Sequence, residues 1–138
     1  MAYDPNNIFA KILKGEIPCH KIYEDEDTIA FLDIMPRSEG HALVVTKERA
    51  RDLFDVDPKA LAKVMAVVQK LGPKIKEAVG ADGVLIHQFN GAAAGQTVFH
   101  LHVHIVPVKQ GVPLKPHTGQ MGDQAELAAT AEKIRKKL

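Results

Sequence analysis

Residues 100–106 read His-Leu-His-Val-His-Ile-Val, so histidine alternates with apolar residues. Side chains of a β-strand point to opposite faces with a period of two. The three histidines are therefore predicted to share one face of a strand, and the apolar residues between them to face the core. The histidines are His100, His102 and His104, and the apolar residues are Leu101, Val103 and Ile105. Three imidazoles on one face do not help a core to pack, so the pattern favours a functional site.

The sequence on either side of the histidines predicts an antiparallel α+β sheet. The histidine strand is expected to run from Val98 to Val106 and to end at Pro107. Further strands are expected over residues 20–23, 28–33, 41–46 and 84–89. Helices are expected after the N-cap residues Asn6 or Asn7, Asp57 and Asp123, and Gly80 should end the longest of them. Strands joined by hairpins and short loops, with one long helix to cover a face, are typical of this fold class.

Composition and charge restrict the function. The chain has 138 residues, which favours a single domain over residues 1–138. Its net charge is +1, whereas a protein that binds duplex nucleic acid typically carries a large excess of basic residues. Its one cysteine, Cys19, allows no intrachain disulfide and fits a reducing compartment. Because the sequence contains neither a basic and apolar leader nor an apolar run of about 20 residues, we expect a cytoplasmic protein without a membrane partner.

The histidine strand allows three interpretations. The first is chance placement of core or surface histidines. The second is a metal site, but the Cα atoms of His100 and His104 should lie about 13 Å apart on a strand. With Zn–N bonds of about 2 Å, at most two of the three histidines could bind one ion. The third interpretation, which the sequence favours, is nucleophilic attack on phosphorus by an imidazole. A glycine-rich loop over residues 91–95, followed by Gln96 and Thr97, would let backbone N–H groups approach an anion.

The histidine stretch resembles the signature of the histidine-triad (HIT) superfamily, which alternates histidine and apolar residues in the same way. The segments around Asn7–Ile12, Glu16–Pro18, Tyr23–Asp25, Ala30–Ile34 and Gly95–Phe99 resemble the family as well. The resemblance covers residues 7–108, is closest to the Hint branch of nucleoside phosphoramidases, and leaves an irregular segment and a helix over residues 109–138. It implies a five-stranded antiparallel sheet, one long helix and short flanking helices. It also implies a homodimer with a ten-stranded sheet, in which the long helix and the fourth strand form the interface.

The resemblance further implies a purine nucleotide ligand, no cofactor and no metal. His102 matches the nucleophile, which would form a nucleotidyl-histidine intermediate, and His104 matches the histidine that contacts the α-phosphate. His100 and His41 match the residues that orient them. Residues near the phosphate and leaving group are matched by Gly95, Gln96 and Thr97. The nucleoside pocket is matched by Asp33 at the ribose and by Ile8, Phe9, Phe31 and Ile34 at the base, although core packing explains these apolar residues about as well.

Two positions depart from the family pattern. Asn7 and Ala10 stand where some bacterial relatives carry zinc-binding cysteines, so that zinc site is not expected. Phe89 stands where many relatives have an asparagine or glutamine that faces the nucleotide. Either Asn90 supplies this contact from the next position or the contact is missing. His87 and His117 lie outside the motif; we expect His87 to serve packing or an interface, and residues 111–122 to border the pocket.

The sequence leaves three functions to compare. The first is hydrolysis of purine nucleoside 5′-phosphoramidates at the α-phosphate. The second is hydrolysis of dinucleoside polyphosphates or nucleotidyl transfer by the same histidines. The third is a purine nucleotide-binding regulatory module.

Overall fold

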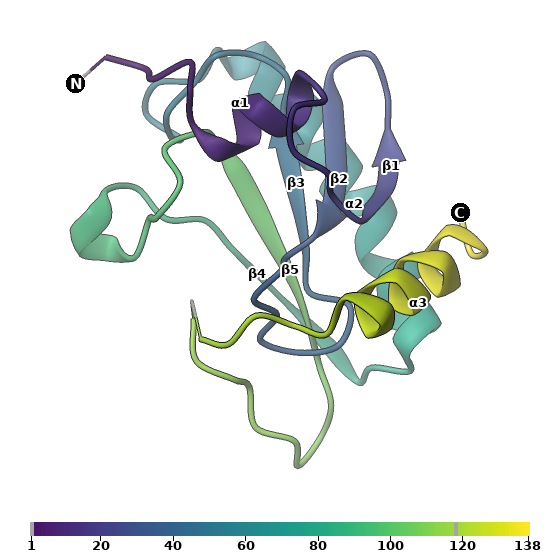
Figure 1. The fold of residues 1–138 in the computed structure, drawn as a ribbon. Helices are drawn as coiled ribbons and strands as arrows, with labels where there is room; N and C mark the ends of the chain where they lie inside the picture. Colours follow the sequence, from purple (N-terminus) through teal and green to yellow (C-terminus); the bar gives the residue numbers. More distant parts are fainter. Residues whose placement is uncertain (1, 118) are drawn as a thin grey trace.

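The computed structural model describes residues 2–117 and 119–138 (Figure 1). Its elements, in chain order, are α1 (Ile8–Leu13), β1 (Lys21–Glu24), β2 (Thr28–Leu32), β3 (Ala42–Thr46), α2 (Pro58–Val79), β4 (Gly83–His87), a 3-10 turn η1 (Ala92–Ala94), β5 (His102–Val108) and α3 (Gln124–Arg135). The strands form one sheet in the order β1-β2-β3-β5-β4, and every neighbouring pair is antiparallel. The predicted five-stranded antiparallel α+β fold is thus confirmed.

Helices cover the two faces of the sheet unequally. The helices α2 and α3 pack on one face, where alternate residues of β3, Ala42 and Val44, join the main core. The short helix α1 covers part of the other face, where Leu43 and Val45 pack with Phe9. Because α1 is only six residues long, it leaves the part of this second face formed by β5 and β4 without a covering helix (Figure 1).

Local signals explain the helix boundaries. Asn7 caps α1, and its side-chain oxygen accepts a hydrogen bond from the backbone N–H of Ala10. Asp57 caps α2 in the same way, and Pro58 occupies the first helical position, where its missing N–H costs nothing. Gly80 ends α2 in the left-handed conformation, with φ 66°. No helix among the described residues is both long and apolar enough to cross a membrane.

The histidine strand differs from the expected one at both ends. It begins at His102 rather than Val98, because the N–H of Leu101 donates to the carbonyl of Ala50 at 2.8 Å and not to a neighbouring strand. It continues through Pro107 to Val108 rather than ending at the proline. The ladder to β3 stops at Ile105, so Pro107 pairs only with Val84 of β4 and its missing N–H interrupts no bond to β3.

Candidate active site

Strand β5 places two of the three histidines side by side on the α1 face of the sheet. His102 lies opposite Val45 in the ladder, His104 lies opposite Leu43, and the ring centroids of the two histidines are 5.0 Å apart. His100 precedes the strand, so the prediction that the strand includes it was wrong, although its ring also lies edge-on to Phe9, with centroids 6.4 Å apart. Leu101 is buried as expected, but in a separate cluster with Ala50 and Val56.

The hydrogen bond of His102 leaves one of its ring nitrogens free to act as a nucleophile. Its Nδ1 lies 2.6 Å from the carbonyl oxygen of His100, and because a carbonyl only accepts, Nδ1 carries the proton. The lone pair is therefore on Nε2. Burial lowers the pKa of His102 to about 4, so the imidazole is neutral near pH 7. The ring of Phe9 packs edge-on against it, with centroids 4.8 Å apart.

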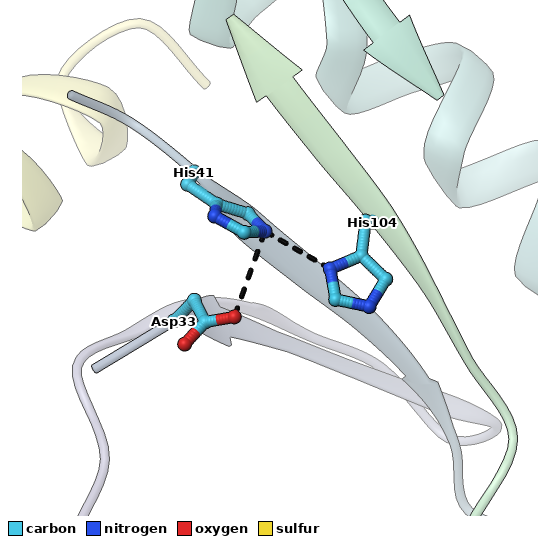
Figure 2. Close-up of side chains that lie close together, drawn as sticks. All are labelled: Asp33, His41 and His104. Carbon is cyan, nitrogen blue, oxygen red and sulfur yellow. Dashed lines mark hydrogen bonds and ion pairs between the residues drawn. The ribbon is translucent and has the colours of Figure 1, made fainter. Parts of the chain in front are cut away.

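A second pair of hydrogen bonds sets the opposite tautomer at His104. The backbone N–H of Arg37 donates to Nδ1 of His41 at 3.0 Å, so the proton of neutral His41 is on Nε2. That Nε2–H donates to Nδ1 of His104 at 2.9 Å (Figure 2), which leaves the proton of His104 on its own Nε2. Burial lowers the pKa of His41 to about 3 and that of His104 to about 2, so both rings are neutral near pH 7.

The Nε2–H of His104 is a donor without an acceptor. It is buried and has no hydrogen-bond partner within residues 2–117 and 119–138. A buried donor left unpaired costs about 1–3 kcal/mol. An acceptor atom of a ligand would recover this cost. The site thus offers an electron pair on His102 and a proton on His104 at neighbouring positions of one strand.

Asp33 completes the group drawn in Figure 2. One carboxylate oxygen accepts the N–H of Met35 at 2.8 Å, and the other lies 3.5 Å from Nε2 of His41. Burial raises the pKa of this carboxyl group. Asp33, His41 and His104 also have potential metal-ligand atoms within 4.8 Å of one another. The N–H of Arg37 favours hydrogen bonding over metal binding, because it keeps the proton of His41 on the nitrogen that would have to bind the ion.

His100 is held by Tyr3, a residue that no sequence motif singles out. The hydroxyl of Tyr3 lies 2.7 Å from Nδ1 of His100, and Nε2–H of His100 donates to the carbonyl of Thr46 at 2.7 Å. Hydrogen bonds thus fix the ring of His100 on both sides. The backbone carbonyl of the same residue accepts the hydrogen bond from His102. Tyr3 is remote in sequence and belongs to no motif, so no local signal could reveal this contact.

The four apolar residues expected around the base divide into two pairs. Phe9 and Phe31 are buried and pack edge-on, with ring centroids 5.4 Å apart. Ile8 and Ile34 are 54% and 44% exposed. The phenylalanines therefore serve the core beside the histidines, whereas the isoleucines have surface to offer a ligand.

The glycine-rich loop is held together by Gln96. Its side-chain oxygen accepts the N–H of Gly91 at 2.8 Å, and its amide nitrogen donates to the carbonyls of Arg51 and Val98. The buried side chain of Gln96 thus shapes the loop from inside, while Thr97 is exposed.

The side chains of Phe89 and Asn90 point to different surroundings, which shows where the polar contact expected at Phe89 is missing. The ring of Phe89 faces the histidines, with its centroid 4.7 Å from that of His87 and 5.6 Å from that of His104. The side chain of Asn90 bonds instead to the backbone N–H of Leu53 and to Gln88. Asn90 is therefore engaged in loop contacts, and an aromatic ring occupies the place of the expected amide.

Two histidines outside the motif join this aromatic group. His87 stacks on His104, with centroids 4.2 Å apart and planes 21° apart, which agrees with the packing role expected of it. His117 reaches the site from the segment after β5. Its Nε2–H donates to the carbonyl of Gly95 at 3.0 Å, and the centroid of its ring lies 5.1 Å from that of Phe89. The expectation that residues 111–122 border the site is met at this position.

Comparison with known proteins agrees with this geometry. Residues 14–111 match the HIT domain family. A crystal structure of a Hit-like protein from Bartonella henselae, solved with an unknown ligand, is 47% identical, has a TM-score of 0.95 and covers all of both chains. Adenosine 5′-monophosphoramidase hnt1 of Schizosaccharomyces pombe is 42% identical over 100 residues, 72% of each chain. Adenylylsulfatase HINT3 of Arabidopsis thaliana is 40% identical over 103 residues, 75% of this chain but only 52% of HINT3.

Proposed function

The chain belongs to the HIT domain family, and from this premise we propose that it hydrolyses purine nucleoside 5′-phosphoramidates at the α-phosphate. The observation that carries the proposal is the pair of opposite tautomers on β5. His102 presents a lone pair on Nε2, and His104 presents a buried, unpaired N–H. Hydrolysis at an α-phosphate needs both of these groups, an atom that attacks phosphorus and a hydrogen-bond donor to a phosphate oxygen.

The proposed reaction has two steps. His102 Nε2 forms a bond to phosphorus while the P–N bond breaks, and the leaving nitrogen takes up a proton from solvent and departs as the amine. The carbonyl of His100 stabilises the positive charge that develops on the His102 ring, because it accepts the Nδ1–H at 2.6 Å. Water then forms a bond to phosphorus and gives one proton to solvent while the bond between phosphorus and His102 Nε2 breaks, which releases the nucleoside monophosphate and restores neutral His102. The Nε2–H of His104 bonds to a phosphate oxygen in both steps.

The nucleoside is proposed to lie toward α1 and the end of β2. Asp33 is positioned to accept hydrogen bonds from the ribose hydroxyls, and the exposed side chains of Ile8 and Ile34 are available to cover the base. Contacts of this kind discriminate weakly between adenine and guanine. Gly95, Gln96 and Thr97 are proposed to border the phosphate, with Gln96 acting by holding the loop.

We also propose a homodimer formed through β4. This strand is an edge of the sheet, and two of its apolar residues, Leu85 and Ile86, are 40% and 41% exposed. An exposed edge with apolar side chains favours pairing with another strand. Two copies joined at β4 would form the ten-stranded sheet expected from the resemblance.

The test is to incubate the protein with adenosine 5′-phosphoramidate and to follow the release of AMP. We expect the wild type and His20→Ala, a control on the surface, to release AMP at the same rate. His102→Ala should lower the rate by a factor on the order of 10³ or more, because it removes the nucleophile. Equal rates in wild type and His102→Ala would refute the proposal. Adenosine 5′-phosphosulfate and a dinucleoside polyphosphate in the same assay test the alternative substrates.

A further inference from the structure

The segment that carries His117 is fixed to the body of the protein on both sides of that residue. The backbone N–H of Lys115 donates to the carbonyl of Arg37 at 2.9 Å, and the Nε–H of Arg37 donates back to the carbonyl of Lys115. On the other side, the N–H of Gly122 donates to the carbonyl of Ile34 at 2.7 Å. His117 is therefore placed at the site by the fold.

His117 lies where the glycine-rich loop meets β5. Its Nε2–H bonds to the carbonyl of Gly95, and its ring stands edge-on to Phe89, with planes at 72°, and to His104, with centroids 5.8 Å apart. Phe89 occupies the position of an expected amide but has no polar atom to offer. His117 packs against that same ring and brings a polar side chain to the same corner of the site.

A phosphate needs more polar contacts than the β5 histidines supply. Their imidazoles are neutral near pH 7 and offer the phosphate one N–H, that of His104. The side-chain atoms of Gln96 are already bonded to the backbone of Gly91, Arg51 and Val98, and Asp33 adds a nearby carboxylate. The imidazole of His117 would supply a hydrogen-bond donor to the negatively charged group when its Nε2–H exchanges the carbonyl of Gly95 for the ligand.

We propose that His117 is a specificity-determining residue that contacts the phosphate of the bound nucleotide in place of the amide replaced by Phe89. The inference rests on the proposed function, because it takes the α-phosphate to lie between His102 and His104. In the absence of nucleotide, the carbonyl of Gly95 holds the ring of His117 beside this position. The nucleoside portion is contacted by other residues and should not be affected by a change at His117.

The experiment compares the binding of AMP and of adenosine by calorimetry. His117→Ala should weaken AMP binding by about tenfold, the size expected for one hydrogen bond to a charged group, and leave adenosine binding within about twofold. His117→Gln, which retains a donor, should recover part of the AMP affinity. His20→Ala, which removes a half-buried histidine bonded to Gln124 outside the site, should bind both ligands as the wild type does. Thermal melting of each variant controls for folding.

Three outcomes would overturn the inference. These are an unchanged AMP affinity in His117→Ala, an equal loss for AMP and adenosine, and a wild type that does not bind AMP. An equal loss would mean that His117 only shapes the pocket. The proposed function fails separately, if the wild type binds AMP but does not hydrolyse the phosphoramidate.

Discussion

Lowering the pH from 7 to 5 is predicted to destabilise the fold through the two hydrogen-bonded histidines, His41 and His104. Their pKa values in the folded protein are about 3 and about 2, against an ordinary value of 6.5. Both rings therefore stay neutral in the fold at pH 5, whereas in the unfolded chain almost every such ring takes up a proton. Stability from these two groups is fully present above pH 6.5 and is lost as the pH falls toward their folded values.

The magnitude follows from proton linkage. Between pH 7 and pH 5, a histidine that is neutral in the fold and ordinary in the unfolded chain costs about 2 kcal/mol, so the pair costs about 4 kcal/mol. His102, with a pKa of about 4, adds to the total loss. The comparison between variants isolates one group, because His104→Gln removes one titrating ring and should reduce the loss by about 2 kcal/mol.

Urea unfolding at pH 7, 6 and 5, at one protein concentration, measures this effect. His20→Gln is the matched control, because it makes the same substitution at a half-buried histidine that bonds to Gln124 and lies outside the His41–His104 pair. If His104→Gln loses as much stability as the wild type between pH 7 and 5, then His104 is protonated in the fold at pH 5. The hydrogen bond from Nε2–H of His41 to Nδ1 of His104 would then not persist at pH 5, and the lowered pKa of His104 would be refuted.

Three further predictions test other parts of the structure. Tyr3→Phe should lower kcat about fivefold with little change in KM, because the hydrogen bond that fixes the ring of His100 is lost. Tyr23→Phe, the control, removes a hydroxyl that bonds to Asp25 and should keep full activity. Equal activities in the two variants would count against a positioning role of Tyr3. Gly40→Ala should lower the free energy of unfolding by about 1–3 kcal/mol, because its φ is +88° and a Cβ would approach packed side chains; an unchanged Tm would contradict this. Leu85→Asp should convert a dimer to a monomer in size-exclusion chromatography, and a wild-type monomer would refute the proposed interface.

Most of the fold could be predicted because its signals are local. Asn7 and Asp57 cap helices with their own side chains, Gly80 ends α2 by its conformation, and period-two alternation locates the strands. The predicted end of the histidine strand was wrong because the end depends on strands that are far away in the sequence. The ladder to β3 ends before Pro107, and no pattern within β5 records the length of β3.

The candidate site was predictable in its centre and not at its edges. His102 and His104 share a face because the period of a strand requires it. The sequence could not show that His100 leaves the strand to bond with Thr46, because that bond spans 54 residues. For the same reason it did not reveal Tyr3. It did identify the exchange at Phe89, but only the fold shows that His117 lies against that ring.

The central claim is that the Nε2 of His102 attacks phosphorus, and a trapped intermediate tests it most directly. The protein is mixed with adenosine 5′-phosphoramidate at near-stoichiometric concentration, quenched in alkali within the first turnover, digested and analysed by mass spectrometry. We expect an adenylyl group on the peptide that contains His102, assigned to that residue by fragmentation and lost in His102→Ala. Release of AMP without such an adduct, or an adenylyl group on His104, would contradict it.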